Sequence, residues 1–261
     1  MKANTSRENN LAFNNFPERY NQGRPVFDQS LIARLLDQME IAENSQALEI
    51  GPATGQLTAA LLQNNLHVTA VEPGPQLASY LQSQPWATEK LQVVCSTFEQ
   101  FDGSLSYSAI FAANSFHWVD PTIGYQKAYN LLHPNGALYL MWTFPILANQ
   151  DLQQQLNEEV FVNEVADFRR QPDQHIDLVQ DLMTQGRTEL MANSPFEQPA
   201  QHELITSQLS WSSDQYIDFQ RSQANGDLIS DTVADQIRAI FADKGDIVID
   251  NHIAITMARK Q

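Results

Sequence analysis

The stretch ALEIGPATGQLT, residues 47–58, decides the fold of this 261-residue chain. It opens on a buried strand, QALEI (46–50), and closes on the helix-forming run LTAALLQNN (57–65). Between them, Gly51 lets the chain leave the strand in a tight turn, and Gly55 lets a ligand approach the backbone closely. The helix that follows presents free N–H groups and the positive end of its dipole to the turn. The stretch therefore predicts a turn that binds a nucleotide or a nucleoside.

The alternation of strand and helix continues on both sides of this turn as far as residue 145. Further strands are expected at 67–73, 91–96, 107–115 and 137–144, and further helices at 26–40, 75–84 and 123–136. Strands and helices that alternate with short connections predict a parallel sheet that is covered on both faces. The expected fold class is therefore α/β and Rossmann-like.

The pattern changes in the second half of the chain. Residues 149–192 are polar and helical without a clear strand, whereas 202–211 and 246–259 are predicted strands on either side of two helices. We expect a seven-stranded, mostly parallel sheet with an antiparallel last strand. The predicted parts are residues 1–145 (an N-terminal segment and the Rossmann-like core), residues 146–200 (a helical insertion that covers the site as a lid) and residues 201–261 (strands and helices that complete the sheet).

Composition limits the kinds of partner. Apolar residues make up 43% of the chain, enough for a large core, and 31 acidic against 15 basic residues give a formal charge of −16. A chain this acidic, with no basic stripe, is repelled by nucleic acids and by anionic membranes. The opening MKANTSRENN is polar and has no apolar segment typical of a secretory signal. We expect a cytoplasmic protein, a monomer or a homodimer, that binds neither nucleic acid nor membrane.

Metal and thiol chemistry have little support in the sequence. Cys95 is the only cysteine, so neither an internal disulfide nor a cysteine zinc site can form. It lies in LQVVCSTF, which is typical of a buried strand end, and we expect a small packed residue there. The histidines show no spacing that is typical of metal ligands. The sequence predicts no metal site.

Two features decide between possible cofactors. The glycine spacing is G-x-x-x-G, with Pro52 after the first glycine, whereas a dinucleotide pyrophosphate is bound by G-x-G-x-x-G. Glu72 ends the second strand, 21 residues beyond Gly51, where a carboxylate can accept hydrogen bonds from both hydroxyls of a ribose. A nucleoside cofactor without a pyrophosphate is favoured. An NAD(P)-dependent oxidoreductase is the alternative on the same fold.

Four segments together resemble a known family. EIGPATG (49–55), AVEPGPQL (70–77), AANSFHWVDP (112–121) and NLLHPNGALYL (130–140) are similar to the successive motifs of class I methyltransferases that use S-adenosylmethionine (SAM). The likeness covers about residues 16–145 and points to the small-molecule branch, the type 11/12 methyltransferases similar to trans-aconitate methyltransferase. It implies SAM as cofactor, S-adenosylhomocysteine (SAH) as product and a small-molecule acceptor with an oxygen, nitrogen or carbon nucleophile.

The resemblance also assigns the cofactor contacts. It implies that Glu49, Gly51 and Gly55 line the methionine end, that Glu72 and Pro73 hold the ribose, that Thr97 and Phe98 flank the adenine, and that Asn114 and Ser115 lie under the ribose and the sulfonium. Ala53 departs from the family, which often has a glycine at this position, and tight packing there is in question.

A fifth segment, ERYNQGRPVF (18–27), resembles a tyrosine–arginine–proline stretch that folds over the cofactor carboxylate in relatives. It implies that Tyr20 and Arg24 bind the cofactor, because a guanidinium can hold a carboxylate with two parallel hydrogen bonds. The alternative is that Arg24 pairs with one of the many surface acids.

His117 and Trp118 follow the fourth predicted strand, at the edge where open α/β sheets bind ligands. His117 is the candidate general base toward an acceptor hydroxyl, and both residues are candidate substrate contacts. The alternatives are a structural hydrogen bond for the histidine and a core position for the tryptophan. A SAM-binding regulatory protein without catalysis also remains open, because fold and cofactor do not fix function.

Overall fold

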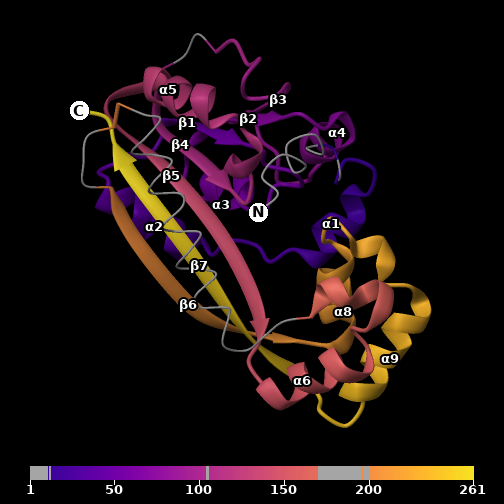
Figure 1. The fold of residues 1–261 in the computed structure, drawn as a ribbon. Helices are drawn as coiled ribbons and strands as arrows, with labels where there is room; N and C mark the ends of the chain where they lie inside the picture. The colour runs from indigo at the N-terminus through magenta and orange to yellow at the C-terminus, as the bar shows by residue number, and fades with distance from the viewer. Residues whose placement is uncertain (1–10, 12, 104–105, 170–194, 197–199) are drawn as a thin grey trace.

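The computed structural model describes residues 11, 13–103, 106–169, 195–196 and 200–261. Its sheet has seven strands in the order β3-β2-β1-β4-β5-β7-β6 (Figure 1). The strands are β1 (Gln46–Ile50), β2 (His67–Glu72), β3 (Leu91–Cys95), β4 (Tyr107–Ala113), β5 (Leu132–Leu147), β6 (Gln201–Trp211) and β7 (Ile247–Arg259). β1 to β5 pair in parallel, and β7 runs antiparallel to both of its neighbours. The predicted α/β fold with an antiparallel last strand is confirmed.

Five of the eight described α-helices begin at a residue whose side chain caps them. The helices are α1 (Pro17–Gly23), α2 (Gln29–Gln38), α3 (Thr58–Gln63), α4 (Pro75–Gln82), α5 (Pro121–Leu131), α6 (Gln150–Glu159), α8 (Ser213–Arg221) and α9 (Asp231–Phe241), with 3-10 turns η2 (Phe116–Trp118), η3 (Asn163–Phe168) and η4 (Gly226–Leu228). Asp28 accepts hydrogen bonds from the first amides of α2, and Asp120 does so for α5. Ser212 and Gln215 form a reciprocal capping box at α8.

Helices cover both faces of the parallel part of the sheet. On one face, apolar residues of α2 and α3, such as Leu35 and Leu61, pack on Phe111 and Tyr139 of the central strands. On the other face, residues of α5 pack on β4 and β5. Since both faces are buried, the central strands read as nearly continuous apolar runs, as expected for a parallel sheet.

A third apolar cluster lies beyond the parallel sheet. The long strands β5, β6 and β7 run past the core to a group formed by α6, α8 and α9, and α1 lies beside α8 (Figure 1). Leu147 and Ile249 at the ends of their strands pack within this group, which we call the helical cluster. The two halves of the chain therefore meet next to α1, close to the carboxyl edge of the sheet.

The structure corrects three sequence expectations. The helix predicted for 123–136 ends at Leu131, because Asn135 takes a positive φ of 64° and the chain enters β5 at Leu132. β5 runs to Leu147, so the predicted boundary after residue 145 falls inside a strand. Cys95 is exposed rather than packed, because β3 is the edge strand of the sheet.

The predicted lid stays a prediction. Its described part, α6 and η3, packs within the helical cluster through residues such as Leu156 and Phe168. Most of the remainder, residues 170–194, lies outside the described residues. None of the described helices is both long and apolar enough to cross a bilayer.

Candidate functional site

The turn after β1 is built from three left-handed residues at alternate positions. Gly51 has a φ of 64°, Ala53 of 50° and Gly55 of 96°. A Cβ on Gly51 would lie 2.6 Å from the Cβ of Ser115, so this position needs both the freedom and the small size of glycine. The Ala53 backbone thus adopts the conformation for which the family often uses glycine. The turn therefore accommodates an alanine at the position where the family often has a glycine.

Gly55 has a different neighbour from the one expected. A Cβ at this position would meet the Trp86 ring at 2.5 Å and Leu81 at 2.7 Å. Gly55 also lines neither of the two cavities described below. The close approach that Gly55 permits is therefore made by a tryptophan of the protein, and the geometry does not support the predicted ligand contact.

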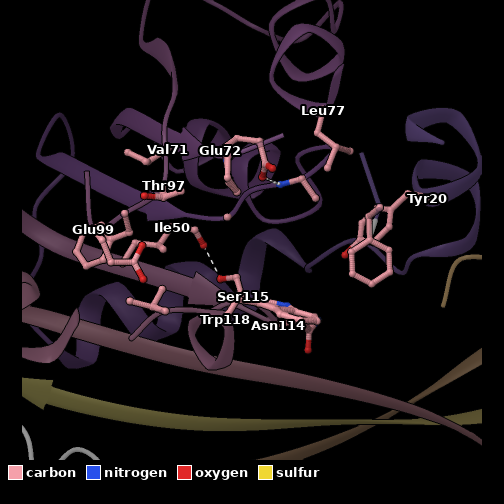
Figure 2. Close-up of a pocket in the computed structure, with 16 residues that line it drawn as sticks. Tyr20, Ile50, Val71, Glu72, Leu77, Thr97, Glu99, Asn114, Ser115 and Trp118 are labelled. Carbon is pink, nitrogen blue, oxygen red and sulfur yellow. Dashed lines mark hydrogen bonds between the residues drawn. The ribbon is translucent and has the colours of Figure 1, made fainter. Parts of the chain in front are cut away.

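Two adjoining cavities open at the carboxyl edge of the sheet, where the turn ends. The large cavity has about 630 Å³ of empty space, including its open mouth, and the small cavity about 370 Å³. Residues lining both are Tyr20, Gly51, Ala53 and Asn114. The large cavity is also lined by Phe13, Ile50, Val71, Glu72, Pro73, Leu77, Thr97, Phe98, Glu99, Ser115, Trp118 and Val119 (Figure 2). The small cavity is also lined by Arg24, Pro25, Phe27, Glu49, Pro52, Gln56, Leu57, Ala113 and Thr143.

The structure brings most of the predicted cofactor contacts to these two cavities. Every residue predicted to bind the cofactor lines one or both cavities, with the exception of Gly55. The residues implied for the ribose and adenine line the large cavity, and those implied for the methionine end line the small one. This division fits an elongated nucleoside with an amino-acid tail.

Glu72 is fixed in place by the turn that it faces. Its Oε2 accepts a hydrogen bond from the Ala53 amide at 3.0 Å (Figure 2). Its Oε1 accepts a hydrogen bond from the Gly74 amide at 2.9 Å. Burial raises the pKa of this carboxyl to about 7, and the two amides oppose that shift. A carboxylate has about four acceptor positions, so each oxygen can still accept a hydroxyl. The arrangement suits a ribose diol.

Glu49 is a second buried carboxyl, at the end of β1. Its exposed fraction is 1%, and its Oε2 accepts a hydrogen bond from the Thr58 hydroxyl at 2.6 Å. Burial is the main reason that its pKa rises to about 8, with a smaller contribution from the nearby Glu72. At neutral pH the empty site therefore holds Glu49 mostly as the neutral acid.

The contribution of Glu49 to the free energy of unfolding is expected to fall as pH rises from 5 to 8. Glu49 takes up its proton near pH 8 in the folded chain but near 4.5 when unfolded, so the folded state holds the extra proton in this window. A single such group changes the free energy by about 1.4 kcal/mol per pH unit. Glu49→Gln should flatten the profile and be more stable than the wild type at pH 8, measured by urea unfolding at four pH values. Parallel profiles for the two proteins would contradict this assignment.

Asn114 and Ser115 are held rigidly at the end of β4. The Asn114 amide donates to the Thr143 hydroxyl at 2.8 Å and accepts from the Thr143 backbone amide at 2.9 Å. Ser115 donates to the carbonyl of Ile50, which ties β4 to the turn after β1 (Figure 2). Thr143 was not predicted as a site residue. Its position near the end of the predicted strand 137–144 was the available signal.

Arg24 spans the site and the helical cluster. Its Nη2 donates to the carbonyl of Ser222, 3.0 Å away in the turn that ends α8, and its guanidinium lies 5.0 Å from the Tyr20 ring centroid and 5.6 Å from that of Phe219. Its buried Nε has no hydrogen-bond partner among the described residues, although Arg24 lines the small cavity. An unpartnered cationic donor at this wall fits the carboxylate of an amino-acid tail.

Lys127 of α5 supports the loop that carries the predicted adenine contacts. Its Nζ donates to the carbonyl of Glu99 at 3.0 Å and to the carbonyl of Phe101, and it lies 5.5 Å from the Phe98 ring centroid. The Glu99 carboxylate in turn accepts from the Asp120 amide at 2.8 Å. The loop is therefore anchored to α5 from behind.

Lys127→Met is expected to weaken SAH binding about tenfold. The change removes two hydrogen bonds from a charged donor, and the loop with Thr97 and Phe98 loses its support. Lys127→Arg keeps a charged donor and should recover part of the affinity. Calorimetry on the three proteins provides the measurement, and equal affinities would show that the loop holds its shape without this lysine.

The two candidate substrate residues, His117 and Trp118, differ in whether they line a cavity. Trp118 lines the large cavity, whereas His117 is exposed and lines neither cavity. The role of His117 as a base stays a prediction that the geometry does not favour. Within the described ranges no three His, Cys, Asp or Glu side chains gather as metal ligands.

Comparison with known proteins agrees with this geometry. Residues 48–138 match a family model described as a methyltransferase domain. An uncharacterized methyltransferase of Mycobacterium tuberculosis is 31% identical over 136 residues, which are 52% of this chain and 54% of the relative. The chain thus spans about half the length of that relative. A probable dimethyladenosine transferase of Dictyostelium discoideum is 35% identical over 88 residues, 32% of this chain and 27% of the relative.

Solved structures share the fold. A proposed type II methyltransferase from Anaeromyxobacter dehalogenans has a TM-score of 0.64 at 16% identity, covering 90% of this chain and 97% of its own. A proposed methyltransferase of an antibiotic biosynthesis pathway from Anabaena variabilis has a TM-score of 0.57 at 16% identity, covering 88% and 98%. Fold, site and family match are together consistent with a class I methyltransferase domain. They support SAM as its cofactor.

Proposed function

We propose that this protein transfers a methyl group from SAM to a small-molecule acceptor. The observation that carries the proposal is the placement of Glu72, Asn114 and Arg24 along two adjoining cavities, in the order that a ribose, a sulfonium and a carboxylate require. The match to a methyltransferase domain supports the same reaction. The activity of the whole protein and the chemical class of its acceptor are what we propose here.

The residues present fit SAM by their own chemistry. Arg24 offers an unpartnered buried donor for the carboxylate, and the left-handed turn at Gly51 leaves the backbone open to close approach. Bound SAM supplies a methyl group that is already activated by the charge on sulfur. The protein's task is then to hold the donor, orient the acceptor and exclude water.

The reaction itself is a displacement at carbon. A lone pair of the acceptor forms a bond to the methyl carbon while the carbon–sulfur bond breaks, and its electron pair stays on sulfur as the neutral thioether of SAH. The acceptor loses a proton if it is a hydroxyl or an amine. Ser115 and Asn114 hold the end of β4 against the turn, which fixes the floor of the site during this step.

A small acceptor is favoured over RNA, although some relatives act on RNA by their names. The match to a ribosomal RNA small subunit methyltransferase A of Mycobacterium avium covers only 22% of this chain. The formal charge of −16 opposes contact with a phosphate backbone. An acidic protein is better suited to a small acceptor than to a nucleic acid, which is usually bound by a basic patch.

The proposal is tested by incubating the protein with methyl-labelled SAM and two acceptor pools. One pool contains small phenols, alcohols, amines and carboxylates, and the other contains ribosomal RNA. We expect label in the first pool and SAH as the co-product. Label in RNA alone would overturn the small-molecule assignment, and SAH binding without any transfer would favour a regulatory role.

A further inference from the structure

The strands that join the core to the helical cluster carry a break in their apolar face. Register pairs Thr143 with Ile253 and Leu147 with Ile249 between β5 and β7. Midway between these pairs, Pro145 faces Asn251, and Asn251 faces Ser207 of β6 on its other side. We call Pro145, Asn251 and Ser207 the junction row. No member of this row belongs to the apolar clusters on either side of it.

The junction row is open at its edge and buried at its centre. Ser207 is exposed and Pro145 half-buried, whereas Asn251 has an exposed fraction of only 5%. The Oδ1 of Asn251 accepts no hydrogen bond within the described part of the chain. A buried polar atom without a partner costs about 1–3 kcal/mol of stability, so its retention needs a reason other than folding.

The other face of the same strand is different. Asp250 accepts a hydrogen bond from Gln208 at 3.0 Å, and His252 bonds with Thr206 at 2.8 Å. Both residues are partly exposed, and their polar groups have partners across the strand pair. The unpartnered amide is therefore a property of the buried face.

The junction row is the next row of the sheet beyond the small cavity. Thr143 lines that cavity and binds Asn114, which is predicted to lie under the sulfonium. Side chains two residues apart on a strand lie on the same face, about 7 Å from each other. Asn251 therefore lies one row farther toward the helical cluster than Thr143, on the neighbouring strand β7.

The charges of the small cavity restrict what can bind beside it. Among the described residues, its one basic lining residue is Arg24 and its one acidic lining residue is Glu49, which is mostly the neutral acid at neutral pH. Arg24 is assigned to the carboxylate of the donor, and Glu49 is held by Thr58. The junction row adds an amide, a hydroxyl and a proline ring, and no charge.

We propose that Asn251 recognises the methyl acceptor, by accepting a hydrogen bond from an uncharged donor group such as a hydroxyl or an amide N–H. This inference rests on the proposed function. The acceptor it describes is small and neutral, and it carries its recognised group on the side of the donor site that faces the helical cluster. The ring of Pro145 provides an apolar contact between this group and the donor site.

The first test uses no acceptor. Asn251→Leu replaces the unpartnered amide with an apolar group of similar size between Ile249 and Ile253, so the melting temperature should rise by about 2–4 °C. The matched control is Asp250→Asn, one residue along the strand on the other face, which should not gain stability. A lower melting temperature for Asn251→Leu would show that the amide is a structural group and would overturn the proposal.

The second test measures methyl transfer to a panel of small phenols, alcohols, amines and carboxylates. For the best substrate, Asn251→Leu should raise KM at least about tenfold while the Kd for SAH stays within twofold of the wild type. Preference for a carboxylate or a cationic amine, transfer to no member of the panel, or an unchanged KM would overturn the proposal. Failure of the wild type to bind SAH would instead refute the function on which it rests.

Discussion

Glu72→Ala is expected to weaken SAH binding by at least about 100-fold. The carboxylate has free acceptor positions for both ribose hydroxyls, and hydrogen bonds to a charged group contribute about 1.5–3 kcal/mol each. Losing two of them removes about 3 kcal/mol, and each 1.4 kcal/mol is a factor of ten. Calorimetry at pH 8 is the appropriate measurement, because burial raises the pKa of Glu72 to about 7 and the wild-type group is charged above that pH.

The control for this change is Glu72→Gln, which keeps the size of the side chain. One oxygen can still accept from a backbone amide, but the amide NH₂ would face either the Ala53 or the Gly74 N–H, which are both donors. We expect an intermediate loss of about tenfold. Full affinity in the alanine variant would show that the ribose is held elsewhere.

Gly51→Ala is expected to damage both the fold and the site. The left-handed backbone costs a non-glycine residue about 1–2 kcal/mol, and the new Cβ would lie 2.6 Å from the Cβ of Ser115. Relief of this overlap must separate the ends of β1 and β4, where the hydrogen bond from Ser115 to Ile50 now holds them together. The melting temperature should fall by about 5–10 °C, and SAH binding should weaken at least tenfold.

A matched control exists two residues away in the same turn. Ala53 also has a left-handed backbone, so Ala53→Gly relaxes strain without adding an atom. Its melting temperature should be equal to that of the wild type or higher. Thermal unfolding of both variants separates the backbone effect from the overlap, and equal losses in the two would contradict this reading of the turn.

The sequence predicted those parts of the site that follow from the order of strands. Glu72 could be assigned from its place at the end of a strand adjacent to the glycine turn, because carboxyl ends of parallel strands meet at one edge. The positions of Tyr20 and Arg24 came from a resemblance, and the structure brings both to the cavities. Strand order was sufficient for Glu72, whereas Tyr20 and Arg24 needed the resemblance to relatives.

Other features depend on tertiary neighbours that no local pattern shows. Gly55 is packed by Trp86, 31 residues farther along the chain, and this contact could not be read from the spacing of the glycines. The burial of Asn251 depends on three paired strands, two of them from the end of the chain. Thr143 belongs to the site because its side chain and backbone bind Asn114 of the neighbouring strand, a contact that the sequence of β5 alone does not show.

The most direct test of the central claim is a calorimetric titration of the wild-type protein with SAM and SAH, beside NAD and NADP. Both adenosyl ligands are expected to bind with micromolar affinity, and neither nicotinamide is expected to bind. Binding of the nicotinamides, or of none of the four ligands, would contradict the assignment of the two cavities to SAM.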